Sequence, residues 1–148
     1  MMVDKDVIGR TWPDKTITVE RGALRFFAEA THEPDPIFSD EAAAKQAGHP
    51  ALPVPPTYFF TLDLLAPADS FWLEDLGVDL SKVLHAEQSF EYDRLVYAGE
   101  TVTIRTRISD AYDKKNGLLE FFVRDIEVID AEQKRCALLK TTLVVRHG

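Results

Sequence analysis

The stretch PVPPTYFFTLDLLAP, residues 53–67, decides the fold. Its prolines hold the incoming chain extended, and the last of the group, Pro56, suits the first turn of a helix. The run from Thr57 to Leu65 is apolar on nearly every side, which is typical of a helix buried in a core. Asp63 is the only charged residue in that run, and Pro67 ends it. The stretch therefore predicts one central helix surrounded by other elements.

Before this stretch, the sequence predicts a short strand and two further helices. Residues 16–19 fit the strand. Residues 39–48 (SDEAAAKQAG) predict a short helix with an N-terminal cap at Ser39 or Asp40. A longer helix over residues 20–31 is indicated by one apolar stripe, formed by Ala23, Phe26, Phe27 and Ala30.

After the stretch, from about Leu84, the pattern changes to one strand after another. Apolar and polar residues alternate with the period of two that a half-buried strand requires. In the segment TVTIRTRIS, the inward positions are Val102, Ile104 and Ile108. The links between strands are short, and Asn116-Gly117 is a strong hairpin signal, so the strands are expected to pair antiparallel. The four predicted strands lie within HAEQSFEYDR (85–94), TVTIRTRIS (101–109), LLEFFVRDIEVID (118–130) and RCALLKTTLVVR (135–146).

These elements predict an α+β fold in a single domain, residues 1–148, with an antiparallel sheet of about five strands wrapped on one buried helix. We find no internal repeat and no linker. One helix cannot cover so long a sheet, and a second sheet beside it would also protect an exposed edge. We therefore expect an oligomer, at least a dimer.

Composition narrows the classes of function. The 148 residues are 45% hydrophobic and carry a net charge of −8, which disfavours nucleic acid and anionic membrane as partners. The single cysteine, Cys136, cannot form an internal disulfide. The opening residues MMVDKDVIGR contain no apolar segment of a signal peptide, and no run is long enough to span a membrane. The expected location is the cytoplasm.

The order of elements resembles the hot-dog fold in its MaoC-like dehydratase branch. RFFAEATHEPDPIFSDEAAAKQAG (25–48), followed by PVPPTYFF (53–60), is similar to the hydratase signature of that family. LHAEQSFEYDRLVYAGETVTIRTRI (84–108) is similar to the first sheet hairpin of its N-terminal half-domain type, also called the FAS1-like dehydratase domain.

The resemblance implies hydration of trans-2-enoyl thioesters, or dehydration of 3-hydroxyacyl thioesters, carried on coenzyme A or acyl carrier protein. It implies neither a metal nor another cofactor. In the family an Asp and a His share one water, and backbone N–H groups hold the thioester carbonyl. The start of the buried helix, at Thr57 and Tyr58, is where such donors are expected, because the first N–H groups of a helix lack partners within it.

Laid on the catalytic loop of the family, this sequence lacks half of the dyad. Glu33 falls at the position of the Asp, and Phe38 falls at the position of the His. A phenyl ring cannot carry a proton. The favoured expectation is therefore an acyl-binding chain, non-catalytic alone, that forms a heterodimer with a catalytic MaoC-like chain. The lining of its acyl tunnel would include Phe38, Tyr58, Phe59 and Phe60.

Three alternatives remain open. In the first, the chain is a homodimeric hydratase with a displaced base, for which His32 is the first candidate and His49 and His85 are others. In the second, it is a hot-dog acyl thioesterase that uses Asp63. In the third, it is a ligand sensor or assembly module without chemistry.

No phosphate-binding glycine loop, paired-cysteine zinc pattern or nucleotide fingerprint is present in the sequence. Candidates to meet the phosphates of coenzyme A are Lys82, Arg94, Lys114 and Lys115.

Overall fold

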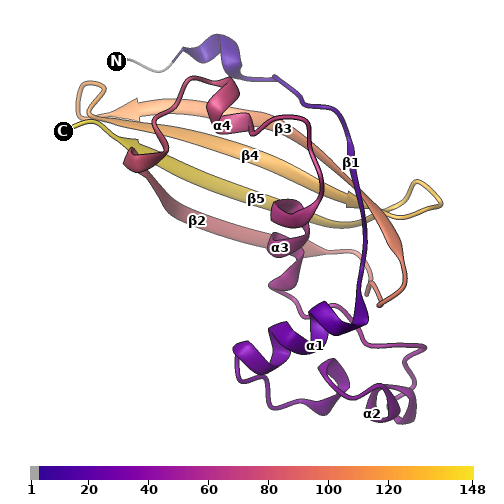
Figure 1. Cartoon of the computed structure of the whole chain (residues 1–148). Coiled ribbons are helices and arrows are strands. Elements are labelled where there is room, and N and C mark those ends of the chain that lie inside the picture. The colour runs from indigo at the N-terminus through magenta and orange to yellow at the C-terminus, as the bar shows by residue number, and fades with distance from the viewer. Residues whose placement is uncertain (1–3) are drawn as a thin grey trace.

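The computed structural model describes residues 4–148, so the first three residues of the predicted domain lie outside it. Five strands form one antiparallel sheet in the order β1-β3-β4-β5-β2, which places β1 and β2 at its edges (Figure 1). The α+β hot-dog architecture with five strands is confirmed. The strands are β1 (Lys15–Thr18), β2 (Val83–Tyr92), β3 (Thr101–Lys114), β4 (Leu119–Ile129) and β5 (Arg135–Arg146).

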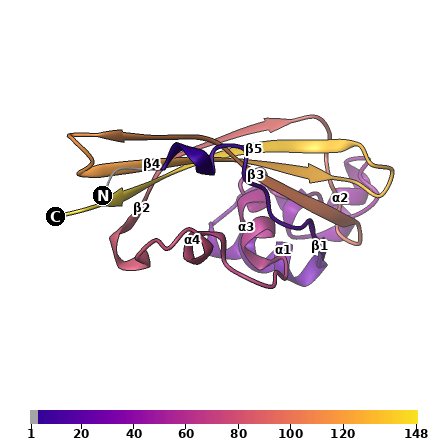
Figure 2. The ribbon, with the colours of Figure 1, turned by 90° about the horizontal axis from the view of Figure 1, so that it is seen from above.

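The helices lie on one face of this sheet, as the view along its edge shows (Figure 2). They are α1 (Arg21–Ala30), α2 (Glu41–Gln46), α3 (Tyr58–Leu65) and α4 (Trp72–Asp75). Three single 3-10 turns accompany them, at η1 (Lys5–Val7), η2 (Pro36–Phe38) and η3 (Leu80–Lys82). Within residues 4–148, no helix is long and apolar enough to cross a membrane.

The main core lies between α3 and the centre of the sheet. The helix buries Phe59 and Leu62, and β3 presents Val102 and Ile104 to the same cluster. Each such side chain contributes about 1.5–3 kcal/mol by leaving water. The alternation predicted for β3 is confirmed, since Val102, Ile104 and Ile108 are all fully buried.

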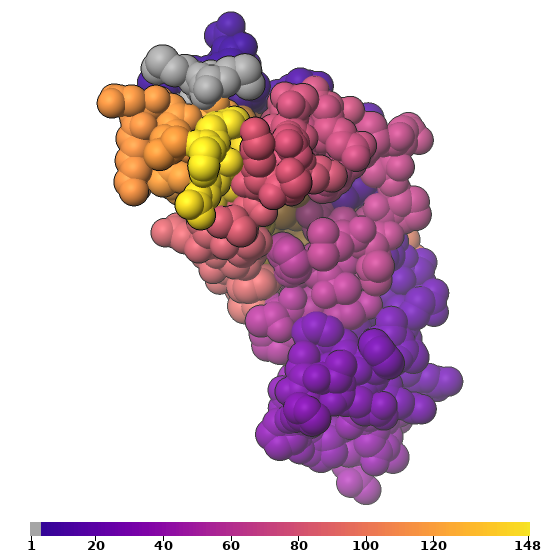
Figure 3. Space-filling model, turned by 60° about the vertical axis from the view of Figure 1, so that its left-hand side comes forward, coloured from indigo at the N-terminus to yellow at the C-terminus, as the bar shows by residue number. Residues whose placement is uncertain are grey.

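A second core covers the other half of the sheet and was not predicted from the sequence. Trp72 and Leu73 of α4 pack with Ile108, Phe122 and Val145 of the sheet. The segment that carries α4 therefore extends the cover beyond α3. In space-filling form α1 and α2 (purple) form one end of the molecule and are continuous with α3 and the segment of α4 (magenta to rose) above them (Figure 3).

Two details of the predicted helices are wrong. In α1 the buried residues are Leu24 and Ala28, whereas Phe26 is 73% exposed, because the apolar stripe is turned by about one residue from the predicted one. The last turn of α3 is also exposed to solvent, since Leu64 is 61% exposed and Leu65 is 57% exposed. The central helix is thus buried at its start and middle rather than all round.

Candidate functional site

The acidic loop after α1 uses its carboxylates to hold its own backbone. Oε1 of Glu33 accepts the N–H of Asp35 at 3.1 Å, and Oδ1 of Asp35 accepts the N–H of Ile37 at 3.1 Å. The second contact caps η2 at its N-terminus. His32 is exposed and has a φ of 55°, in the left-handed region. The two carboxylates therefore stabilise the turn, and His32 occupies a left-handed backbone position in it.

Phe38 is the last residue of η2, and its side chain is half-buried. Its N–H donates to the carbonyl of Asp35 at 3.3 Å, which closes the turn. The loop is tied to the start of α3 through α1, where the rings of Phe27 and Tyr58 meet edge to face at 5.1 Å. The acidic loop and the start of the central helix thus lie at the same end of the molecule (Figure 1).

The start of α3 offers free backbone donors, at positions slightly different from those expected. The N–H of Tyr58 donates to the carbonyl of Pro55 at 3.0 Å, so it is not free. No residue between Asp4 and Gly148 accepts the N–H of Thr57 or of Phe59. Such unpaired donors carry the partial positive charge of a helix N-terminus and suit a carbonyl or an anion.

Aromatic side chains join the first turns of α3 to the edge strand β2. The ring centroids of Phe59 and Tyr92 are 5.6 Å apart, and Phe60 meets His85 edge to face at 5.6 Å. The hydroxyl of Tyr92 donates to the carbonyl of Pro56 at 2.7 Å and fixes the approach to the helix. Burial raises the pKa of the Tyr58 phenol, which stays neutral. These rings belong to the main core or border it.

The other histidines and basic residues named from the sequence are not brought together. His49 bonds the hydroxyl of Tyr97 at 3.0 Å, and His85 contacts Gln88 at 3.3 Å. Arg94 forms an ion pair with Glu100 and a second with Asp130. Lys114 lies over the rings of Tyr112 and Phe121, while Lys82 and Lys115 are exposed. In the described chain, no three side chains of His, Cys, Asp or Glu gather closely enough to hold a metal ion.

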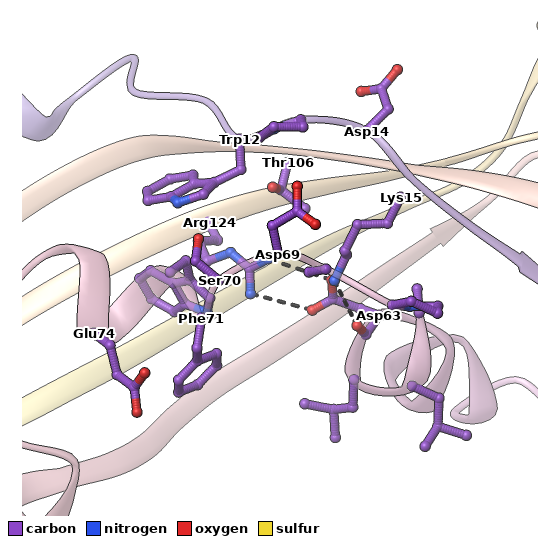
Figure 4. Close-up of a pocket in the computed structure, with 17 residues that line it drawn as sticks. Trp12, Asp14, Lys15, Asp63, Asp69, Ser70, Phe71, Glu74, Thr106 and Arg124 are labelled. Atoms are coloured by element: carbon purple, nitrogen blue, oxygen red, sulfur yellow. Dashed lines mark hydrogen bonds and ion pairs between the residues drawn. The ribbon is translucent and has the colours of Figure 1, made fainter.

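Asp63 lies instead in a buried ionic cluster with Lys15 and Arg124 (Figure 4). Nζ of Lys15 is 2.8 Å from Oδ1 of Asp63 and also donates to its backbone carbonyl at 2.7 Å. Nη1 of Arg124 is 3.2 Å from Oδ2. Burial lowers the pKa of the Arg124 guanidinium, and Asp63 acts in the opposite direction. A charge on a buried helix needs such partners.

Sequence reasoning missed Lys15 and Arg124, although the strand pattern contained a signal for the second. In β4 the inward positions alternate through Phe122, Arg124 and Ile126, so an arginine stands where an apolar residue is expected. An inward arginine on a strand and a lone aspartate on a buried helix predict each other as partners. No comparable signal marks Lys15, which is the first residue of a short edge strand.

The ionic cluster forms the floor of a cleft of about 720 Å³. Thr106 of β3 also lines the cleft, and Trp12, Phe71 and Trp72 form an aromatic wall, in which Trp72 meets Trp12 and Phe71 edge to face at 6.2 and 6.5 Å. The guanidinium of Arg124 lies 4.5 Å from the ring centre of Trp72, a cation–π contact. None of the residues of the acidic loop or of the first turn of α3 contributes to the cleft, so the two regions are separate.

Comparison with known proteins gives matches over most of the chain. The model of the family described as FAS1-like, dehydratase domain region, matches residues 6–138. A UPF0336 protein of Thermobifida fusca is 31% identical over 147 residues, which are 99% of this chain and 95% of that protein. A UPF0336 protein of Streptomyces coelicolor is 37% identical over 109 residues, 73% of each chain.

Among solved structures, one match is the C-terminally truncated HadBC complex of Mycobacterium tuberculosis, a (3R)-hydroxyacyl-ACP dehydratase. A chain of that complex has a TM-score of 0.79 and 25% sequence identity, and the match covers 97% of this chain and 99% of that one. A chain of the ChsH1–ChsH2 complex from the same organism matches with a TM-score of 0.70 and 21% identity, over 92% and 85% of the two chains. With its fold, element order and family match in agreement, the chain belongs to the FAS1-like, dehydratase domain region family, and it has the hot-dog fold of solved MaoC-like dehydratases.

Proposed function

We propose that this chain is the acyl-thioester-binding subunit of a MaoC-like enoyl-thioester hydratase or 3-hydroxyacyl-thioester dehydratase, and that it is non-catalytic alone. It would act in the cytoplasm on substrates carried by coenzyme A or acyl carrier protein. The observation that carries the proposal is Phe38, a residue without a titratable group, which falls at the position of the catalytic histidine when this loop is laid on the family pattern.

The hydrogen bonds of the acidic loop support this proposal. Hydration needs one group that takes a proton from water and another that gives a proton to the substrate carbon. Glu33 is the only carboxylate at a dyad position, and one of its oxygens already accepts the Asp35 N–H. With phenylalanine at position 38, the loop would offer one partly engaged carboxylate and no second titratable group at the family position.

The start of α3 has the donors that the binding role requires. The N–H groups of Thr57 and Phe59 have no partner in the described chain and suit a thioester carbonyl. Phe60 is half-buried between α3 and the edge strand β2, where an acyl chain would find apolar surface. Tyr58 and Phe59 are more deeply buried and would shape that surface from beneath.

The partner would supply the missing Asp–His dyad. The HadBC and ChsH1–ChsH2 structures are both complexes of two chains, in accord with such an arrangement. A longer MaoC-like dehydratase contains this fold in 43% of its chain, with a TM-score of 0.83. The edge strand β2, most of whose residues are exposed, is the place where a second sheet would pair.

The alternatives are less well supported by the geometry. His32 is exposed at the outside of the turn and has no side-chain hydrogen bond within the described chain. Asp63 has both oxygens occupied by Lys15 and Arg124, which leaves it poorly placed to act as a base or nucleophile. Each alternative nevertheless makes a distinct kinetic prediction.

The test measures hydration of crotonyl-CoA and trans-2-octenoyl-CoA by the isolated chain, together with hydrolysis of octanoyl-CoA. We expect no rate above that of buffer in either assay. A fast hydration that is lost in Glu33→Ala or His32→Ala would establish a displaced-base enzyme and overturn the proposal. Hydrolysis that is lost in Asp63→Asn would overturn it in favour of a thioesterase.

A further inference from the structure

We infer that the cleft above Lys15, Asp63 and Arg124 is a second binding site, for a monocarboxylate that carries an apolar or aromatic body. The cleft shares no residue with the acidic loop or with the first turn of α3. The inference is therefore independent of the acyl-thioester role.

The buried side chains of the cleft carry more positive than negative charge. Two cations, Lys15 and Arg124, face one carboxylate, Asp63, and their side chains are 16%, 7% and 4% exposed. Buried charges are normally balanced by partners, because an unpaired charge loses its hydration without compensation. With a bound carboxylate, the cluster would contain two positive and two negative charges.

Unused hydrogen-bond donors also lie at the floor. Nε of Arg124 is buried and has no partner. Thr106 is 5% exposed and lines the cleft, and within residues 4–148 its hydroxyl makes no hydrogen bond. Nζ of Lys15 makes two hydrogen bonds, both to Asp63, and an ammonium group has three donors. Thr106 and Lys15 can therefore each donate to a ligand oxygen without giving up an existing bond.

The walls and the lip indicate what surrounds the anionic group. Trp12, Phe71 and Trp72 form one wall, and the exposed Leu64 and Leu65 continue the apolar surface. A cleft of about 720 Å³ is within the usual range for small-molecule sites.

Three further carboxylates line the cleft, those of Asp14, Asp69 and Glu74; all three are exposed, and Asp14 is paired with Arg105. They would repel a ligand with several negative charges, such as a phosphate ester. A ligand with one carboxylate at the floor and an apolar body against the aromatic wall fits all of these features.

The two tryptophans make the site directly observable. Trp12 and Trp72 are the only tryptophans of the chain, and both line the cleft. Titration with 3-phenylpropanoate should therefore change the tryptophan emission in a saturable way. The uncharged 3-phenylpropanamide has the same body and should bind at least about tenfold more weakly, because it cannot neutralise the surplus cation.

Two variants and one control locate the binding. Thr106→Val keeps the shape of the side chain and should weaken binding about 3- to 10-fold through loss of one hydrogen bond. Lys15→Met leaves Asp63 paired with Arg124 and should weaken binding of 3-phenylpropanoate at least about tenfold. Lys45→Met removes an exposed lysine of α2, paired with Glu41 outside the cleft, and should leave binding unchanged. Thermal melting verifies that each variant is folded.

Several outcomes would overturn the inference. The first is equal affinity for 3-phenylpropanoate and 3-phenylpropanamide. The second is displacement of the bound carboxylate by inorganic phosphate at the same concentration as by the carboxylate itself. The third is an unchanged affinity in a folded Thr106→Val variant. The absence of any saturable change in the wild type would also contradict it. If Lys15→Met does not fold, Thr106→Val and the acid–amide comparison still decide the question.

Discussion

At the scale of single residues, the proposed function depends most on Phe38. We predict that Phe38→His raises hydration of crotonyl-CoA by about 10²–10⁴-fold above the wild type, because it adds a second proton-carrying group to the loop that holds Glu33. Phe38→Leu is the matched control and should stay inert. The measurement is a stopped assay of enoyl-thioester hydration. A folded Phe38→His variant as inert as the control would contradict the assignment of this position.

Asp63 illustrates the effect of one charge on stability. Asp63→Asn would leave Lys15 and Arg124 buried without their carboxylate, so we expect a loss of about 3–5 kcal/mol in the free energy of unfolding. Asp14→Asn breaks the exposed pair with Arg105, and should reduce the unfolding free energy by no more than about 1 kcal/mol. Urea unfolding of the two variants measures both values. Equal losses would contradict a central structural role for the cluster.

Cys136 gives a chemical readout of the folded state. Burial in β5 raises the pKa of its thiol to about 11, so at pH 8 the reactive thiolate is scarce in the folded chain. The raised pKa means that the thiolate fraction grows only as the pH approaches that value. We expect slow labelling by a disulfide reagent at pH 8 and rapid labelling once urea unfolds the chain. Rapid labelling without urea would contradict the placement of the strand.

At the scale of elements, the contact between α3 and β2 fixes the start of the central helix. Tyr92→Phe keeps the rings in contact with Phe59 and Phe90 but removes the hydroxyl that donates to Pro56. We predict a loss of about 0.5–1.5 kcal/mol in unfolding free energy, measured by urea titration. Tyr92→Ala removes the ring as well and should lose more. If Tyr92→Phe leaves the free energy of unfolding unchanged, the hydroxyl does not stabilise the start of the helix.

Local patterns in the sequence predicted the strongly marked elements and missed those defined by distant contacts. The prolines and apolar run of residues 53–67 predicted α3, and the period of two predicted β3. The four residues of α4 are too few for a periodic signal, and it is held by Trp72 packing on β3, β4 and β5. The position of Phe26 depends on how α1 is rotated against the rest of the core, which no spacing within the helix determines.

The same limit applies to the candidate site. Glu33 and Phe38 were found by matching a loop that is continuous in sequence, and the structure adds the hydrogen bonds that occupy its carboxylates. The ionic cluster joins residues from β1, α3 and β4, far apart in the chain, and only Asp63 was singled out beforehand. Contacts between distant segments are the part of the site that required the structure.

At the scale of the whole molecule, the exposed edge strand β2 predicts assembly by edge-to-edge pairing. We expect the chain to sediment as a dimer at micromolar concentration, with two sheets joined into one. Lysines are typical of strand edges that resist pairing. Replacing the exposed Ala86 and Ser89 by lysine should therefore shift the chain toward monomer, and the same change at exposed Ala42 and Ala47 of the α2 region should not. A wild type that sediments as a clean monomer would contradict this expectation.

The central claim is that this chain supplies binding and a second chain supplies the dyad. It is tested most directly by hydration of trans-2-octenoyl-CoA in a titration of this chain into a candidate partner, a MaoC-like chain that retains its Asp and His. We predict a negligible rate for this chain alone, and for the mixture a rate that rises and saturates at one chain per partner. A mixture no faster than the partner alone, or full turnover by this chain without a partner, would contradict the claim.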